Sequence, residues 1–185
     1  LFVRDRVLDG TDNFEIRFLI NARSLDTGIP WVYAGCISSH GQTMPIFPNE
    51  TACLRCLFDS PPDAGSTETC DTAGILGPTV NVIASLQAMT AIKILAGRRE
   101  DVALSLTVID VCGCTLRQMN VSDLREQANC AACQHGERLW ISGQQGSQST
   151  ILCGRYAVQI PPQETATLSP YQNARHPRSA ENVTQ

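Results

Sequence analysis

The sequence predicts an α/β fold, because helical patterns alternate with short strand patterns along most of the chain. Residues 13–28 and 76–97 carry helical signals, and apolar, β-rich stretches precede and follow each of them. Apolar residues make up 43% of the 185 residues, which is enough for a packed core. We therefore expect one main domain with an open sheet, in which ligands bind beyond the carboxyl ends of the strands.

The first helix is expected over residues 13–28. A short apolar strand ends at Leu8, and the Asp-, Gly- and Asn-rich residues 9–13 form a turn after it. Asn13 is a candidate N-cap, and Gly28 is a suitable end for the helix. The buried face of this helix is expected at Ile16, Leu19 and Ile20.

Two strands and a loop should follow this helix. Residues 29–38 are β-rich, residues 40–42 (HGQ) suit a turn, and residues 43–48 read as a returning strand. Pro45 in that strand has no backbone N–H, so it indicates an edge or a bulge. Residues 58–72 are rich in Pro, Gly, Ser, Asp and Thr, which is typical of an exposed loop.

The second helix is expected over residues 76–97. Pro78 suits its first turn, and Gly97 suits its C-terminal cap. Apolar residues recur at steps of three and four, which predicts a buried face at Val82, Leu86, Met89 and Ile92.

The C-terminal third of the chain changes character along its length. Residues 102–111 and 115–124 read as an antiparallel pair that completes a main domain of residues 1–137. Residues 138–160 contain two strand-like stretches, 139–143 and 150–160, and we interpret them as the start of a small appended β segment. Residues 161–185 are polar and Pro-rich without a period, so we expect a disordered tail there.

The composition argues against several kinds of partner. The net charge is −4 and no run of Lys or Arg occurs, whereas a nucleic-acid surface needs clustered positive charge. We find no apolar run of membrane-spanning length and no signal peptide, because Arg4, Asp5 and Arg6 interrupt the first apolar residues. These features favour a cytoplasmic protein with no membrane or nucleic-acid partner.

The cysteines indicate a metal site. There are nine, and four of them form two C-x-x-C pairs that are far apart in the sequence. Four thiols are what a closed tetrahedral zinc site needs, and such a site is structural because it leaves no open position. The alternatives are a redox dithiol or four incidental buried thiols. The expected zinc ligands are Cys53, Cys56, Cys130 and Cys133.

Two further groups carry chemistry in more than one interpretation. Polar residues after the first strand, with Asp12 and Arg17 among them, suit Mg²⁺ and phosphate, or else a plain strand–turn–helix with Asn13 as its cap. Cys70 lies before the second helix and is a reactive thiol, a small residue packed under a loop, or a fifth thiol near the zinc. The remaining thiols read as core residues: Cys36, Cys112, Cys114 and Cys153.

Four motifs in this order resemble the ThiF/MoeB family of adenylyltransferases. They are LDGTDNFEIRFLIN, CLRC, TCDTAGILGPTVNVIASLQAMTAIKILAG and CAAC, and the resemblance covers about residues 5–133. It implies a Rossmann-like domain with a structural zinc site. It also implies ATP- and Mg²⁺-dependent adenylation of the C-terminal glycine of a ubiquitin-like sulfur carrier protein. The pathways implied are sulfur transfer in thiamine or molybdenum-cofactor biosynthesis, with a sulfur donor and a homodimer.

The resemblance also implies roles for individual residues. Asp12 matches the acidic residue next to ATP and Mg²⁺, and Asn13 and Arg17 flank it and shape the pocket. The four cysteines of the C-x-x-C pairs match the structural zinc ligands. Cys70 matches a loop cysteine that links covalently to the activated carrier in some members.

One family feature is missing from the chain. The family begins with a strand and a Gly-rich phosphate loop, and no G-x-G-x-x-G occurs here. We therefore expect the C-terminal part of an adenylation domain, truncated at its N-terminus and inactive alone. The rival hypothesis is a non-catalytic, zinc-stabilised module that binds a partner without using ATP.

Overall fold

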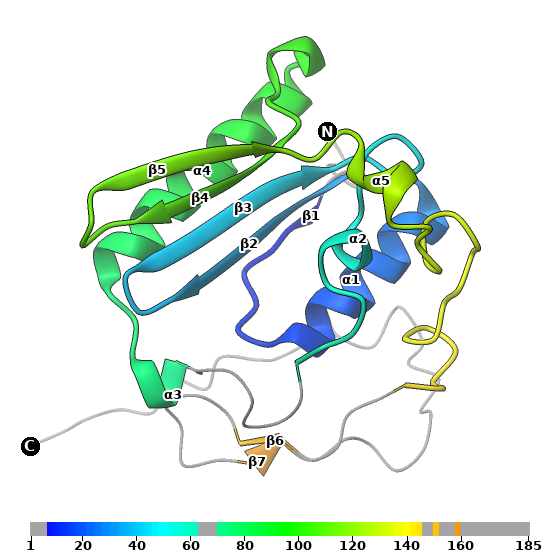
Figure 1. The fold of residues 1–185 in the computed structure, drawn as a ribbon, viewed down its shortest axis with the longest axis horizontal. Helices are drawn as coiled ribbons and strands as arrows, with labels where there is room; N and C mark the ends of the chain where they lie inside the picture. Colours follow the sequence, from blue (N-terminus) through cyan, green and yellow to red (C-terminus); the bar gives the residue numbers. More distant parts are fainter. Residues whose placement is uncertain (1–6, 63–69, 146–149, 152–157, 160–185) are drawn as a thin grey trace, which may run out of the picture.

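A five-stranded mixed sheet with helices on both faces forms the centre of the molecule (Figure 1). The computed structural model describes residues 7–62, 70–145, 150–151 and 158–159. The sheet order is β1-β2-β3-β4-β5, and the α/β class expected from the sequence is confirmed. Its strands are β1 (Val7–Leu8), β2 (Trp31–Ile37), β3 (His40–Ile46), β4 (Ser105–Asp110) and β5 (Thr115–Asn120).

Five α-helices and one short 3₁₀ helix are present in the described residues. The helix α1 joins two parallel strands, β1 and β2, so these elements form a β-α-β unit, while all other pairs in the sheet are antiparallel. The helices are α1 (Phe14–Thr27), α2 (Leu54–Leu57), α3 (Cys70–Ala73), α4 (Gly77–Leu95) and α5 (Leu124–Gln127), with the 3₁₀ turn at Arg99–Asp101.

The alternation of side chains along β2 divides the core into two layers. Trp31 and Tyr33 lie in the cluster that contains Phe18 of α1. Val32 packs with Ile94 of α4 on the opposite face of the strand. Since successive residues of a strand point to opposite faces, α1 and α4 cover different sides of the sheet.

The turn between β2 and β3 lies two residues earlier than expected. His40 already pairs with Ile37, and Ser38 takes a left-handed backbone conformation with φ 51°. The prediction of a turn at residues 40–42 was therefore wrong. Pro45 behaves as expected, because β3 pairs with β4 only over residues 40–43, which leaves Pro45 on a free edge.

Gly41 is needed where β3 meets α4. A Cβ atom at this position would lie 2.4 Å from Cγ1 of Ile83. We expect Gly41→Ala to lower the free energy of unfolding by about 1–3 kcal/mol through overpacking, measured by urea titration. Gly77→Ala is the control, because nothing lies within 4 Å of a Cβ there. Equal stability of the two variants would contradict this close packing.

The ends of α1 are confirmed, but its buried face is not the predicted one. The Asn13 side chain accepts a hydrogen bond from the Ile16 amide (2.9 Å), and Gly28 ends the helix with φ 72°. Leu19 is 44% exposed, and Ile16 and Ile20 are only partly buried. The buried face carries polar groups that find partners inside the fold, and it consists of Arg17, Phe18, Asn21, Ala22, Ser24 and Leu25.

The predicted face of α4 was also wrong. Met89 and Ile92 are 52% and 57% exposed, and Val82 is exposed as well. The helix is apolar almost all round, so its pattern alone does not choose a side. Gln87 decides it, since its Nε2 donates to the backbone oxygens of Asp9 (2.9 Å) and Val32 (2.8 Å). The buried residues are Thr79, Ile83, Gln87, Ala91 and Ile94.

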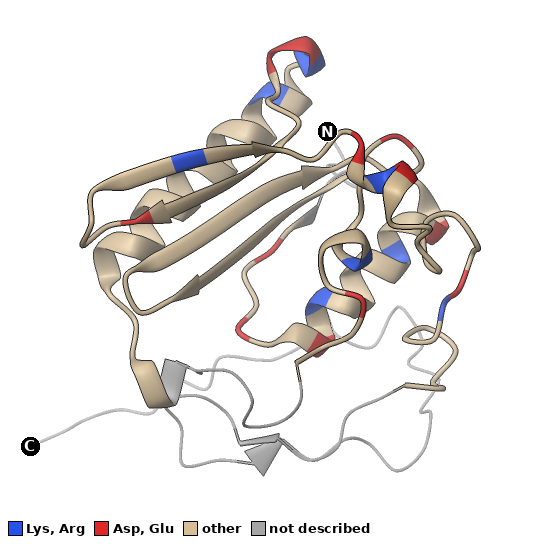
Figure 2. Cartoon of the chain, in the orientation of Figure 1, with Lys and Arg blue, Asp and Glu red and all other residues tan. Residues whose placement is uncertain are grey.

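The helix α4 contradicts the expectation that no apolar run of the chain reaches membrane-spanning length. By length and composition alone, α4 is long and apolar enough to cross a membrane. Figure 2 shows how few charged residues it carries before its C-terminal end. In the described residues one face of α4 packs on β2 and β3, where Gln87 is fixed, so the helix is part of the α/β fold although much of its surface is exposed.

Two expectations about the later residues were wrong. Cys112 and Cys114 are exposed in the connection between β4 and β5, and are not core residues. Residues 139–143 form turns instead of a strand. Strands β6 (Thr150–Ile151) and β7 (Val158–Gln159) pair with each other within the predicted second stretch. Cys153 and residues 161–185 lie outside the described residues, and the domain boundary at 137 remains a prediction.

Candidate functional site

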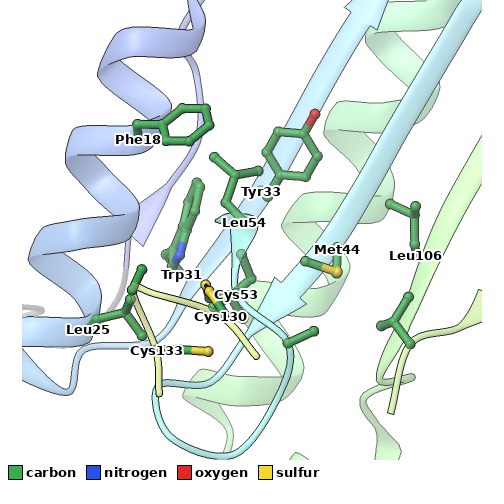
Figure 3. Packing of buried hydrophobic residues seen from close by; sticks show 14 residues of the cluster. Phe18, Leu25, Trp31, Tyr33, Met44, Cys53, Leu54, Leu106, Cys130 and Cys133 are labelled. Carbon is green, nitrogen blue, oxygen red and sulfur yellow. Dashed lines mark hydrogen bonds between the residues drawn. The ribbon is translucent and has the colours of Figure 1, made fainter. Parts of the chain in front are cut away.

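Four cysteine side chains from two distant segments meet beneath α1. Cys53 and Cys56 come from the start of α2, and Cys130 and Cys133 follow α5 in the chain. Their sulfur atoms all lie within 4.8 Å of one another. Figure 3 shows Cys53, Cys130 and Cys133 together beside Trp31 and Leu25. The local spacing of each C-x-x-C pair brings two thiols together, and the fold brings the two pairs together.

The sulfur–sulfur distances match those of a tetrahedral metal site. The Sγ atoms of Cys53 and Cys130 are 3.7 Å apart, and Cys56 lies 3.6 Å from Cys133 and 3.9 Å from Cys53. A tetrahedron with zinc–sulfur bonds of about 2.3 Å has edges of about 3.8 Å. The cluster could therefore hold a metal ion of this size without moving its ligands.

The thiols of this cluster perturb one another strongly. Hydrogen bonding to Cys130, followed by that to Cys133, raises the pKa of Cys53. Hydrogen bonding from Cys53 lowers the pKa of both Cys130 and Cys133. Four thiols this close cannot all ionise in a buried setting unless a cation balances the charge of the resulting thiolates. A bound metal ion would supply that positive charge.

The cluster is continuous with the hydrophobic core. Cys53 is fully buried, and the Leu54 amide next to it donates to Oδ1 of Asn21 on α1 (2.9 Å). Trp140 packs on Phe18 with ring centroids 5.2 Å apart, which covers the outer side of this core. A metal ion here would join the segments after β3 and after β5 to the buried side of α1.

The loop between β1 and α1 is held by a buried ion pair. Asp9 and Arg17 are both buried, and Nε of Arg17 lies 3.1 Å from Oδ2 of Asp9. Oδ1 of Asp9 accepts hydrogen bonds from the amide (2.9 Å) and hydroxyl (2.7 Å) of Thr11. Arg17 also donates to the Thr11 carbonyl oxygen (2.7 Å). These bonds give residues 9–13 a defined shape.

Arg17 thus has a different position from a solvent-facing phosphate ligand. Its guanidinium group lies over the rings of Phe14 (5.5 Å) and Tyr33 (5.8 Å) as well as beside Asp9. Burial is the main cause that raises the pKa of Tyr33. These contacts indicate that the buried Arg17 side chain holds residues 9–13 in their conformation.

Asp12 is the outward-facing member of the predicted site. It is exposed, in the loop that follows β1, and Asn13 after it serves as the N-cap of α1. Because β1 and β2 are parallel, this loop lies on the carboxyl side of the sheet, beyond the end of β1 and beside β2, which continues to Ile37. The carboxyl edge is the usual ligand-binding position in open α/β sheets, and an exposed carboxylate there suits a hydrated Mg²⁺ ion.

The segment that carries Cys70 reaches the same edge of the sheet. Cys70 begins α3, and its side chain lies outside the described part of the structure. Ser38, directly after β2, donates its amide to the Gly74 carbonyl oxygen (3.0 Å) and accepts from the Leu76 amide (3.0 Å). The connection between α3 and α4 is therefore attached at the carboxyl end of β2.

Two residues that organise this edge were missed at the level of sequence. Asp9 was treated only as one of several polar residues. An Asp two residues before Thr11 does favour a turn in which its side chain accepts a hydrogen bond from the Thr11 amide. Gln87 joins α4 to Asp9 and β2 through backbone oxygens, and nothing in its local sequence indicates this.

Comparison with known proteins identifies the family. The ThiF family model matches residues 2–133. The chain is 35% identical over 154 residues to the sulfur carrier protein ThiS adenylyltransferase of Bacillus subtilis, covering 83% of this chain and 44% of that protein. It is 33% identical over 135 residues to the sulfur carrier protein adenylyltransferase of Thermus thermophilus, covering 70% and 48%.

Solved structures show the same fold at low identity. A crystal structure of Escherichia coli MccB superimposes with a TM-score of 0.54 at 19% identity, covering 70% of this chain and 38% of that one. The chain spans less than half the length of the curated relatives described above. The match over residues 2–133 includes the Asp12 loop and all four clustered cysteines, and the chain belongs to the ThiF family.

Proposed function

We propose that this chain is part of an adenylyltransferase that uses ATP and Mg²⁺ to adenylate the C-terminal glycine of a ubiquitin-like sulfur carrier protein. The observation that carries the proposal is the shaped loop after β1, which presents Asp12 on the carboxyl side of the two parallel strands. The named activity of the Bacillus and Thermus relatives supports it. Thiamine or molybdenum-cofactor biosynthesis is the proposed setting.

The residues of the loop have distinct tasks in this proposal. Asp12 would hold Mg²⁺, and the ion would supply positive charge near the phosphate oxygens. The carboxylate of the carrier attacks the α-phosphate, and pyrophosphate leaves with the electron pair of the broken P–O bond. Asn13 fixes the start of α1, and Arg17 with Asp9 keeps the loop from collapsing into the crevice. Binding geometry then depends on groups that are already ordered before ATP arrives.

The four clustered cysteines hold a structural Zn²⁺ ion in this proposal. Four thiolates fill a tetrahedral shell, so no position remains for a reacting water molecule. The ion would stabilise the fold without taking part in adenylation. The sulfur–sulfur distances of 3.6–3.9 Å and the burial of Cys53, Cys130 and Cys133 support this assignment.

Cys70 is proposed to act after adenylation. Its thiolate attacks the carbonyl carbon of the acyl-adenylate, and AMP leaves with the bonding electron pair, which joins the carrier to Cys70. A donor of sulfide-level sulfur then attacks the carbonyl carbon of this thioester, and the Cys70 thiolate leaves, which gives the thiocarboxylate of the carrier. The attachment of the α3–α4 connection at the carboxyl edge of β2 supports a position for Cys70 on the side of the sheet that bears Asp12.

We further propose a cytoplasmic homodimer. Large exposed apolar side chains along α4 support its burial against further protein surface, because monomers seldom expose large apolar patches. These side chains are Val80, Val82, Met89, Ile92 and Leu95.

Pyrophosphate exchange tests the proposed activity. The protein expressed from the whole reading frame that contains this chain is incubated with ATP, labelled pyrophosphate and a ubiquitin-like carrier ending in Gly-Gly. We expect carrier-dependent exchange. We expect Asp12→Asn to reduce it by about a hundredfold, since a preorganised charge contact to the reacting phosphates is lost.

Asp26→Asn is the matched control for Asp12→Asn. Asp26 is also an exposed carboxylate but lies at the opposite end of α1 from Asp12, in an ion pair with Arg23 on the helix surface. This variant should keep wild-type exchange. No exchange by the wild-type protein would refute the adenylyltransferase proposal and leave the zinc-stabilised binding module as the better hypothesis.

A further inference from the structure

The connection between β4 and β5 carries two free, exposed thiols. It consists of Val111, Cys112, Gly113 and Cys114, and Asp110 pairs with Thr115 on either side of it. Both thiols are exposed at the end of this hairpin. Exposed cysteines are uncommon in folded proteins, and two of them with one residue between make this loop chemically distinctive.

The spacing of the two cysteines is compatible with a disulfide bond. Two Cα atoms that are two residues apart are separated by at most about 7 Å, and by less in a turn. Disulfides require Cα atoms roughly 4.4–6.8 Å apart. The Cys114 amide donates to the Val111 carbonyl oxygen (3.4 Å), so the backbone does turn between these residues.

Asp110 holds the loop in one shape. Its carboxylate accepts hydrogen bonds from the Cys112 amide (3.1 Å), the Gly113 amide and the Ser39 hydroxyl (2.9 Å). A Cβ atom at Gly113 would lie 2.5 Å from Oδ2 of Asp110, so this position accepts only glycine without a shift. The two cysteines are therefore presented on an ordered turn.

The surroundings favour disulfide chemistry over metal binding. Across the described residues, the four-cysteine cluster at the core is the one group of three or more ligating side chains whose donor atoms lie within 4.8 Å. Cys112 and Cys114 thus belong to no such group in that part of the chain. Two thiols without further ligands suit exchange with another disulfide.

We propose that Cys112 and Cys114 form a thiol–disulfide exchange site that reacts with disulfides of low-molecular-weight thiols. One thiolate attacks a sulfur of the external disulfide, and the first thiol leaves with the electron pair of that bond. The second cysteine then attacks the protein sulfur of the mixed disulfide and releases the second thiol. Two electrons pass from the cysteines to the external disulfide, and the two released thiolates take up the two protons.

Hydrogen bonds of Ser38 and Ser39 connect the loop of Cys112 and Cys114 with the α3–α4 connection. Ser39 bonds to Asp110, and the neighbouring Ser38 bonds to the Gly74 and Leu76 backbone. Figure 1 shows the β2–β3 turn, the β4–β5 connection and α3 at the same end of the molecule. The proposal does not depend on adenylation, since it uses neither Cys70 nor Asp12.

Glutathione equilibration followed by mass spectrometry tests the proposal. The full-length protein is equilibrated with reduced and oxidised glutathione, quenched with acid, alkylated and digested with trypsin. Cleavage after Arg99 and Arg117 yields a peptide of residues 100–117 that contains both Cys112 and Cys114 and no other cysteine. Cys70 falls in a separate peptide, residues 56–93, so the two sites are measured independently.

The concentration dependence distinguishes the intraloop disulfide from a simple glutathione adduct. At a fixed ratio of oxidised to reduced glutathione, diluting both about tenfold raises the oxidised-to-reduced ratio of an internal disulfide about tenfold, because two thiols are released per disulfide consumed. We expect this for wild type, with loss of two hydrogens from the peptide. Cys112→Ser should instead form a glutathione adduct at Cys114 that is insensitive to dilution.

Cys36→Ser is the control, since Cys36 is partly buried on β2. It should behave like wild type. A wild-type peptide that stays reduced in oxidised glutathione, or that carries a persistent adduct insensitive to dilution, would overturn the proposal.

Discussion

Cys53→Ser is expected to lower the free energy of unfolding by more than about 4 kcal/mol, the size of effect associated with loss of a structural metal. Cys53 is fully buried, and its sulfur lies 3.7 Å from Cys130 and 3.9 Å from Cys56. Serine keeps the size of the side chain but is a poor zinc ligand, so the remaining thiols lose their shared cation. Urea titration and metal analysis by atomic absorption measure both effects on the same sample.

The wild-type protein should contain one zinc ion per chain, and the variant should contain almost none. Chelation at acidic pH should have a similar effect on the wild type, because protons compete with the metal for thiolates. Cys112→Ser is the matched control, since it removes an exposed thiol outside the cluster. A wild-type melting temperature for Cys53→Ser would show that the cluster does not support the fold through a metal.

Asp9→Asn is expected to cost about 3–5 kcal/mol, the range for breaking a buried ion pair from one side. Asp9 has no exposed side-chain surface, and the substitution leaves the Arg17 guanidinium buried without a counter-charge. It also weakens the bonds that shape residues 9–13. The free energy of unfolding from urea titration is the measurement.

Arg23→Met provides the comparison for this prediction. Arg23 and Asp26 form an exposed pair on α1 at 3.0 Å. Solvent screens such pairs, so the loss should stay below about 1 kcal/mol. If Asp9→Asn were no more destabilising than Arg23→Met, the buried pair would not be an important contributor to the stability of the loop.

Local sequence rules predicted the ends of the helices well. Asn13 and Gly28 cap α1 as expected, because capping depends on a few adjacent residues whose side chain or backbone freedom is suited to the task. The two thiols within each C-x-x-C pair likewise lie together as expected, since a spacing of two residues lets both face one point. The antiparallel pairing of β4 and β5 was also predicted correctly.

The same rules failed for the sides on which the helices pack. In α1, Arg17 is buried because Asp9 is its partner, and Asn21 is buried because it accepts a hydrogen bond from the Leu54 amide. Neither partner belongs to α1, so the pattern of residues within the helix does not reveal them. In α4, apolar residues lie on both sides, and Gln87 selects the buried one through backbone oxygens of two other segments. A periodicity argument treats all three of these polar residues as solvent-facing.

By itself, the sequence determined the α/β class, the ends of the two predicted helices, the closeness of the two thiols within each C-x-x-C pair, and the family. Each of these depends on residue types at fixed local spacing. Only the tertiary structure decided that Arg17 braces the loop from inside and that Cys112 and Cys114 are exposed at the end of a hairpin. The physical reason is that burial of a polar or sulfur-containing side chain depends on whether a distant segment satisfies its hydrogen bonds or covers it. That information is absent from any short window of the chain.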